Sequence, residues 1–131
     1  MLTGNTSIVH GDFHAGQIFF GSAPRMTWVL DLDDLAFGHK ESDLGNLSAY
    51  LATARETTLN DVFGAYIYWA SQVKAAYDDL AKRSLNHEVI HAYGTIALLR
   101  RGLKLWERTG DNHMLDDILD ASRRLSERQQ P

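Results

Sequence analysis

Apolar residues recur at intervals of three or four over most of the chain after residue 40, and this spacing predicts helices. Four helical segments are expected, at roughly 42–53, 58–82, 87–108 and 112–127. The third segment is predicted to bury the face that contains Val89, Tyr93, Ile96 and Leu103. Amphipathic helices bury their apolar faces against one another, so this part of the chain is expected to form a helical bundle.

The chain before residue 40 differs, with short β-rich runs among Gly, Asp and His residues. Residues 17–21 (QIFFG) and 27–31 (TWVLD) are rich in aromatic and β-branched side chains, which favour strands. Pro24 lies in the polar segment between them and is typical of a turn. These features predict a β-hairpin ahead of the helices.

The length of 131 residues fits one domain, spanning 1–131. The expected fold class is α+β and predominantly helical. Residues 1–40 are expected to form loops and a hairpin, and residues 41–131 the helical bundle.

Composition excludes several classes of partner. The 13 Lys and Arg against 17 Asp and Glu leave a net charge of −4, which argues against nucleic acid and tolerates a cationic substrate. The pairs Arg100-Arg101 and Arg123-Arg124 lie near acidic residues and are interpreted as solvated helix faces. No apolar run reaches the roughly 18 residues of a membrane span, and no signal peptide is visible. Because the chain has no Cys, disulfides and thiolate zinc sites are excluded, and a cytoplasmic location is expected.

The segment with the most chemical information is residues 9–17 (VHGDFHAGQ). Asp12 precedes a side-chain amide, Gln17, by five residues, and Asp31 follows at the end of the next β-rich run. Phosphoryl transfer uses one carboxylate to orient the attacking hydroxyl and accept its proton, and further oxygen ligands to hold Mg²⁺. The predicted hairpin brings Gln17 and Asp31 together, because they lie at its two open ends.

The spacing of these residues resembles the aminoglycoside phosphotransferase and choline kinase family. That family has His-Gly-Asp, four residues, usually Asn, a hairpin, and an Ile-Asp or Leu-Asp strand end. Residues 10–12 (HGD) and 30–31 (LD) match this pattern. The family also has a Gly seven residues after the second Asp and an Asp-Leu pair five residues later, which Gly38 and Asp43-Leu44 match.

The resemblance implies the C-terminal catalytic lobe of a protein-kinase-like small-molecule kinase. Asp12 then corresponds to the catalytic base, and Asp31 and Gln17 to the metal ligands. Gln17 stands where Asn is usual, which moves the amide oxygen outward by one methylene. The implied cofactors are Mg²⁺ and ATP or GTP as co-substrate, and the implied partner is a small-molecule hydroxyl acceptor.

The remaining residues of the motif are expected to support the site. His10 and Gly11 belong to the catalytic loop, and His10 is expected to hydrogen-bond within it rather than act as a base. Asp43 is expected to cap a helix or to tie the loop down. Asp33 and the neighbouring Asp34 are candidates for auxiliary metal or substrate contacts.

Only nine residues precede the motif, whereas in the family the phosphate-binding Lys, its Glu partner and the adenine hinge all lie before it. We therefore expect the N-lobe to be absent and the chain to be incomplete as an enzyme. The alternative is a non-catalytic remnant or binding module that keeps the fold of the lobe. An exposed apolar surface, covered by self-association, is expected around Ile8, Val9, Phe19 and Phe20.

A more remote alternative is a zinc hydrolase, because residues 87–91 (HEVIH) match the H-E-x-x-H pattern. His87 and His91 would share a helix face, and Glu88 could activate bound water. The third ligand of the longer motif is missing, since Ala97 occupies its position. Glu107 is sixteen residues beyond His91, roughly 24 Å away along one helix, so it cannot complete this site.

Overall fold

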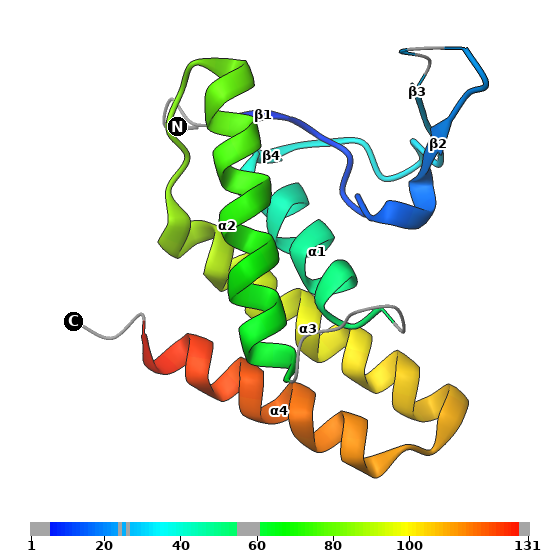
Figure 1. Cartoon of the computed structure of the whole chain (residues 1–131), viewed down its shortest axis with the longest axis vertical. Helices are drawn as coiled ribbons and strands as arrows, with labels where there is room; N and C mark the ends of the chain where they lie inside the picture. The colour runs from blue at the N-terminus through cyan, green and yellow to red at the C-terminus, as the bar shows by residue number, and fades with distance from the viewer. Residues whose placement is uncertain (1–5, 24, 26, 55–60, 129–131) are drawn as a thin grey trace.

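A computed structural model describes residues 6–23, 25, 27–54 and 61–128. These residues form a predominantly helical structure with two small antiparallel sheets (Figure 1). The elements in chain order are β1 (Thr6–Val9), the 3-10 helix η1 (Ala15–Gln17), β2 (Ile18–Phe20), β3 (Thr27–Val29), β4 (Ala36–His39), α1 (Glu41–Ala52), α2 (Val62–Ala81), α3 (His87–Thr109) and α4 (Asn112–Glu127).

The four helices and the hairpin expected from the sequence are confirmed. Residues 58–60 of the second predicted segment lie outside the described residues, and α2 begins at Val62 after Asp61, whose side chain accepts the Gly64 N–H. Asn86 caps α3 in the same way by accepting the Glu88 N–H. Within the described ranges, no helix has both the length and the apolar character needed to cross a membrane.

The hairpin is the sheet β2–β3, in which Ile18 pairs with Val29 and Phe20 with Thr27. A second sheet was not predicted. It pairs β1 with β4 in antiparallel register, from Thr6 opposite His39 to Val9 opposite Ala36. This pairing holds the segment before the predicted catalytic loop beside the segment that leads into α1, so the two sheets flank the loops that contain the motif (Figure 1).

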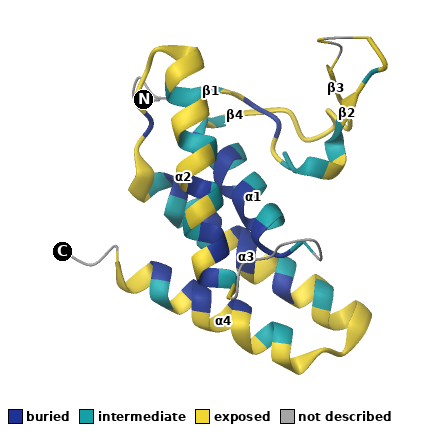
Figure 2. Cartoon of the chain, viewed as in Figure 1, coloured by how far each residue is buried: buried dark blue, intermediate teal, exposed yellow. Residues whose placement is uncertain are grey.

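The buried core lies among the four helices, whereas the hairpin is largely exposed (Figure 2). The expectation of an exposed apolar surface is confirmed at Ile8, Phe19 and Phe20, which are 66%, 56% and 79% exposed. It is wrong at Val9, which is buried. Successive residues of a strand point to opposite faces, so Val9 faces inward, against Gly38, when Ile8 faces outward.

The predicted buried face of α3 is wrong in part, because Ile96 and Leu103 are 64% and 55% exposed. The face that packs against the other helices contains Ile90, Gly94, Ala97, Leu98 and Gly102 instead. Its small residues let the backbones of α1 and α3 approach closely. A Cβ built on Gly45 of α1 would lie 2.8 Å from the Ile90 carbonyl oxygen. The face of α3 that turns toward α1 is therefore determined by the close approach of the two backbones and not by the largest side chains of α3.

Candidate active site

The loop after β1 is held by the carboxylate of Asp43, which projects from the first turn of α1. The His10 N–H donates to Asp43 Oδ2 at 2.7 Å, and the Gly11 N–H donates to Oδ1 at 3.0 Å. Lys40, the N-cap residue of α1, makes no side-chain capping hydrogen bond. The Asp43 carboxylate accepts hydrogen bonds from the neighbouring loop and not from the backbone at the N-cap of α1. Two backbone donors and one carboxylate thus fasten residues 10–11 to the start of α1.

The ring of buried His10 links this loop to the end of the hairpin. Its Nε2 lies 2.7 Å from the Leu30 carbonyl oxygen, and the Asp12 N–H donates to its Nδ1 at 3.4 Å. A carbonyl oxygen only accepts and an N–H only donates, so Nε2 is the donor and Nδ1 the acceptor in this pair of contacts. His10 therefore positions the loop through hydrogen bonds.

Gly11 lies in the left-handed backbone region with φ = 88°. A Cβ at this position would lie 2.5 Å from the backbone oxygen of Asp34. Both the backbone conformation and the lack of space require glycine here. The loop that contains Asp12 and the loop after β3 consequently touch through their backbones.

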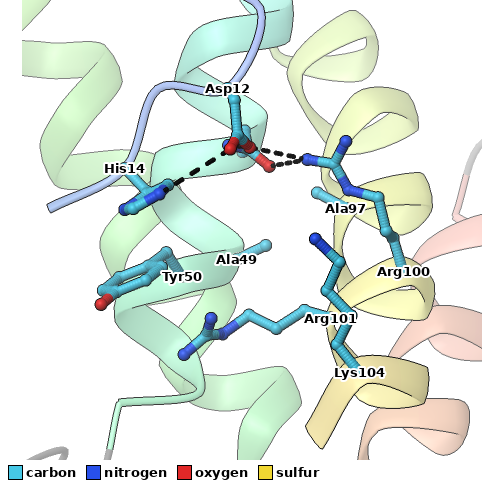
Figure 3. Close-up of a pocket in the computed structure, with 9 residues that line it drawn as sticks. Asp12, His14, Ala49, Tyr50, Ala97, Arg100, Arg101 and Lys104 are labelled. Atoms are coloured by element: carbon cyan, nitrogen blue, oxygen red, sulfur yellow. Dashed lines mark hydrogen bonds and ion pairs between the residues drawn. The ribbon is translucent and has the colours of Figure 1, made fainter. Parts of the chain in front are cut away.

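The side chain of Asp12 lies where the loop meets α1 and α3 (Figure 3). Arg100 Nη2 donates to Asp12 Oδ1 at 3.0 Å and to Asn46 Oδ1 at 3.0 Å, and Asn46 Nδ2 donates to Asp12 Oδ1 at 3.4 Å. Asn46 also donates to the Phe13 carbonyl oxygen at 2.9 Å. The Asp12 carboxylate is held from two helices and keeps about a third of its surface exposed.

His14 lies on the other side of Asp12, with Nε2 3.8 Å from Asp12 Oδ2. Its ring stacks on Tyr50 of α1, with the two ring centroids 4.6 Å apart. Burial lowers the pKa of His14 below 6.5, although the Asp12 carboxylate opposes this shift. His14 is therefore neutral at neutral pH and leaves the charge of Asp12 uncompensated on this side.

The hairpin brings Gln17 and Asp31 together, as their positions at its open ends predict. Gln17 Nε2 donates to Asp31 Oδ2 at 3.0 Å, and the Leu30 N–H donates to the Gln17 carbonyl oxygen at 2.9 Å. Asp31 adopts the left-handed region with φ = 58° although it is not glycine. Such conformations are strained and cluster at functional sites.

A carboxylate and an amide are the ligand types that suit Mg²⁺, so the donor set of Gln17 and Asp31 fits this ion. Among the described residues, no group of three His, Asp or Glu gathers as a metal site. Asp33 and Asp34 are exposed, and among the described residues no hydrogen bond is donated to either carboxylate.

The two histidines of the H-E-x-x-H pattern do lie together on α3. The His87 and His91 ring centroids are 5.9 Å apart with the rings nearly perpendicular, and His91 Nδ1 lies 3.5 Å from the hydroxyl of Tyr66. Because the described residues hold no group of three such ligands, they supply no third protein ligand for zinc at this place.

The half of the site that comes from the helices was not predicted from the sequence. The interpretation of Arg100 and Arg101 as a solvated helix face is wrong for Arg101, which is half-buried and lies over the Tyr50 ring, 4.1 Å from its centroid. It holds only in part for Arg100, which is exposed but also binds Asp12. Asn46 was also missed. One signal was available for it: Asn46 follows Asp43 by three residues, so both lie on the same face of α1.

Comparison with known proteins identifies the family of the chain. No curated protein and no solved structure matches the chain. The model of the phosphotransferase enzyme family, APH, matches residues 1–102. The matched region contains the loop of Asp12, the hairpin, the Asp31 loop and most of α3, so that the chain belongs to the phosphotransferase enzyme family.

Proposed function

We propose that the chain is the catalytic lobe of a protein-kinase-like small-molecule kinase, which transfers the γ-phosphoryl group of ATP or GTP to an acceptor hydroxyl. The observation that carries this proposal is that the loop of Asp12 and the loop of the Gln17–Asp31 pair are linked, because the ring of His10 contacts the Leu30 carbonyl oxygen next to Asp31. Asp43 fastens the Asp12 loop to α1. Membership of the phosphotransferase family supports the reaction class.

Asp12 is the proposed catalytic base. In the transfer, the acceptor oxygen forms a bond to the γ-phosphorus while the bond from that phosphorus to the β,γ-bridging oxygen breaks. Asp12 accepts the proton of the acceptor hydroxyl. Its carboxylate is partly exposed and faces a pocket, so an acceptor can reach it. Asn46 and Arg100 fix its orientation, which favours a productive approach of the hydroxyl.

Asp31 and Gln17 are the proposed Mg²⁺ ligands. When bound, Mg²⁺ supplies positive charge against the nucleotide phosphates. The left-handed backbone of Asp31 and its hydrogen bond from Gln17 hold this pair at the open end of the hairpin. The Leu30 carbonyl contact of His10 connects the pair to the Asp12 loop, so base and metal ligands keep one relative position.

The proposal is tested by transfer of labelled γ-phosphate from ATP and from GTP, with Mg²⁺, to a panel of small hydroxyl compounds. Asp12→Asn keeps the size of the side chain and removes the proton acceptor. We expect transfer to fall by about 10²- to 10⁴-fold, the usual contribution of a general base. Asp116→Asn is the matched control, because Asp116 is exposed on α4, and it is expected to leave the rate unchanged.

Equal rates for wild type and Asp12→Asn would show that Asp12 is not the base. A folded wild-type chain that transfers phosphate to none of the compounds would contradict catalysis by this lobe on its own and favour the non-catalytic binding module. Circular dichroism spectra of all the variants establish that each is folded.

A further inference from the structure

The pocket beside Asp12 is strongly basic for a chain whose net charge is −4. Among the described residues that line it, Arg100, Arg101 and Lys104 are cationic, and Asp12 is anionic. Since the pKa of His14 is lowered, this residue adds no charge at neutral pH. Two positive charges therefore remain without a balancing carboxylate among the described lining residues.

These cations come from one helix and reach the pocket from the same side. Arg100 and Lys104 are four residues apart on α3, so their side chains lie one above the other. Figure 3 shows the Arg100 guanidinium directed at Asp12, the Lys104 amine directed into the pocket, and Arg101 extended toward Tyr50. The Arg101 Nε also donates to Thr53 Oγ1, which holds its guanidinium against α1.

The basic cluster lies on the acceptor side of the proposed base. Neither Gln17 nor Asp31 belongs to the lining of this pocket, whereas Asp12 does. The nucleotide phosphates are expected at the metal pair, so they do not explain three cations between α1 and α3. An acceptor that offers its hydroxyl to Asp12 extends into these cations instead.

We propose that the acceptor is an anionic hydroxyl compound, whose carboxylate or phosphate group binds Arg101 and Lys104 while its hydroxyl faces Asp12. This inference rests on the proposed transfer reaction for the role of the hydroxyl. The binding of the anion depends only on the basic cluster. The net charge of −4 tolerates a cationic substrate, whereas the local charge of this pocket favours an anionic one.

The inference is tested by NMR titration of the chain without nucleotide, using probes of similar size and different charge. D-glycerate and glycerol 3-phosphate are anionic, glycerol is neutral and choline is cationic. We expect the anionic probes to bind more tightly than glycerol and choline, with an affinity that falls as salt is raised. The two anionic probes distinguish a carboxylate site from a phosphate site.

Lys104→Gln removes one charge and is expected to weaken binding of the anionic probes by about threefold to fivefold, the range of an exposed charge pair. Lys104→Glu is expected to weaken it further. Lys82→Gln is the matched control, since Lys82 is exposed and pairs with Asp79 at the end of α2, and it is expected to change nothing. Because Lys104 is exposed and has no hydrogen bond or ion pair among the described residues, neither variant at this position should disturb folding.

Absence of a preference for the anionic probes, or binding that Lys104→Gln leaves unchanged, would overturn the inference. A loss of ATP affinity in Lys104→Gln with unchanged probe binding would assign the cations to the nucleotide and overturn it too. Anion binding that persists in Asp12→Asn supports the inference even where no transfer occurs, and such a result counts only against the kinase proposal. Efficient transfer to choline, unaffected by Lys104→Gln, would keep the kinase and reject the anionic acceptor.

Discussion

Asp43 is the residue whose removal should loosen the catalytic loop most directly. Its carboxylate accepts the His10 N–H at 2.7 Å and the Gly11 N–H at 3.0 Å. A hydrogen bond to a charged group contributes about 1.5–3 kcal/mol, and a solvent-accessible one is at the low end or below. The His10 bond is partly buried and the Gly11 bond is exposed, so together they should contribute about 2–3 kcal/mol.

Asp43→Ala is therefore expected to lower the free energy of unfolding by about 2–3 kcal/mol, with a further small loss because Asp43 lies in the first turn of α1. Urea denaturation followed by tryptophan fluorescence measures this change. The amide signals of His10 and Gly11 in a ¹⁵N–¹H spectrum report the two hydrogen bonds directly. Both signals should move toward the positions of amides that bind water.

Asp116→Ala is the control, because this carboxylate lies on the exposed face of α4 and makes no hydrogen bond or ion pair with any other described residue. Its free energy of unfolding should stay within about 0.5 kcal/mol of wild type. The reasoning is refuted if Asp43→Ala behaves like this control and the His10 and Gly11 amide signals stay in place. Such a result would mean that the loop is held by other contacts, such as the one between His10 and Leu30.

Two further predictions concern the helices. Gly94→Ala should destabilise the protein by about 2–4 kcal/mol in urea denaturation, because the new methyl group would overlap the ring and hydroxyl of fully buried Tyr66. Adding Tyr66→Phe removes the hydroxyl and should restore part of the lost stability. If the double variant recovers no stability, the overlap with Tyr66 is not the cause. Burial lowers the pKa of His91 below 6.5, so the unfolded chain binds more protons than the folded one as the pH falls through 6.5. The free energy of unfolding should therefore fall as the pH is lowered from about 7.5 to 5.5. His91→Gln should flatten this pH dependence, whereas the control His113→Gln should not. Equal slopes in wild type and both variants would contradict the role of His91.

The parts of the fold that could be predicted are those encoded by local sequence. The aromatic and β-branched runs at residues 17–21 and 27–31 and the turn chemistry between them are sufficient to predict a hairpin. A hairpin necessarily brings its ends, Gln17 and Asp31, together. The helices are likewise predicted from apolar spacing and from capping residues such as Asn86. Each of these features depends on residues close to one another in the chain.

The parts that could not be predicted depend on how distant segments meet. Arg100 contacts Asp12 across 88 positions, and no local pattern distinguishes it from an arginine on a solvated helix face. The rotation of α3 follows from close backbone packing around Gly45 and Gly94, which leaves Ile96 exposed despite its helical spacing. The site therefore has a locally encoded half, in the loops, and a half that exists only after the helices pack.

The left-handed conformation of Asp31 has a consequence for attempts to engineer this protein. Glycine adopts that backbone region without strain, so replacing Asp31 with glycine would be a reasonable choice for a designer who considers only thermostability. The same exchange would delete the carboxylate that accepts from Gln17. Under the proposed role of Asp31 in holding Mg²⁺, resistance to heat and phosphate transfer are thus opposed at a single backbone angle, and the exchange that favours the first would remove the second.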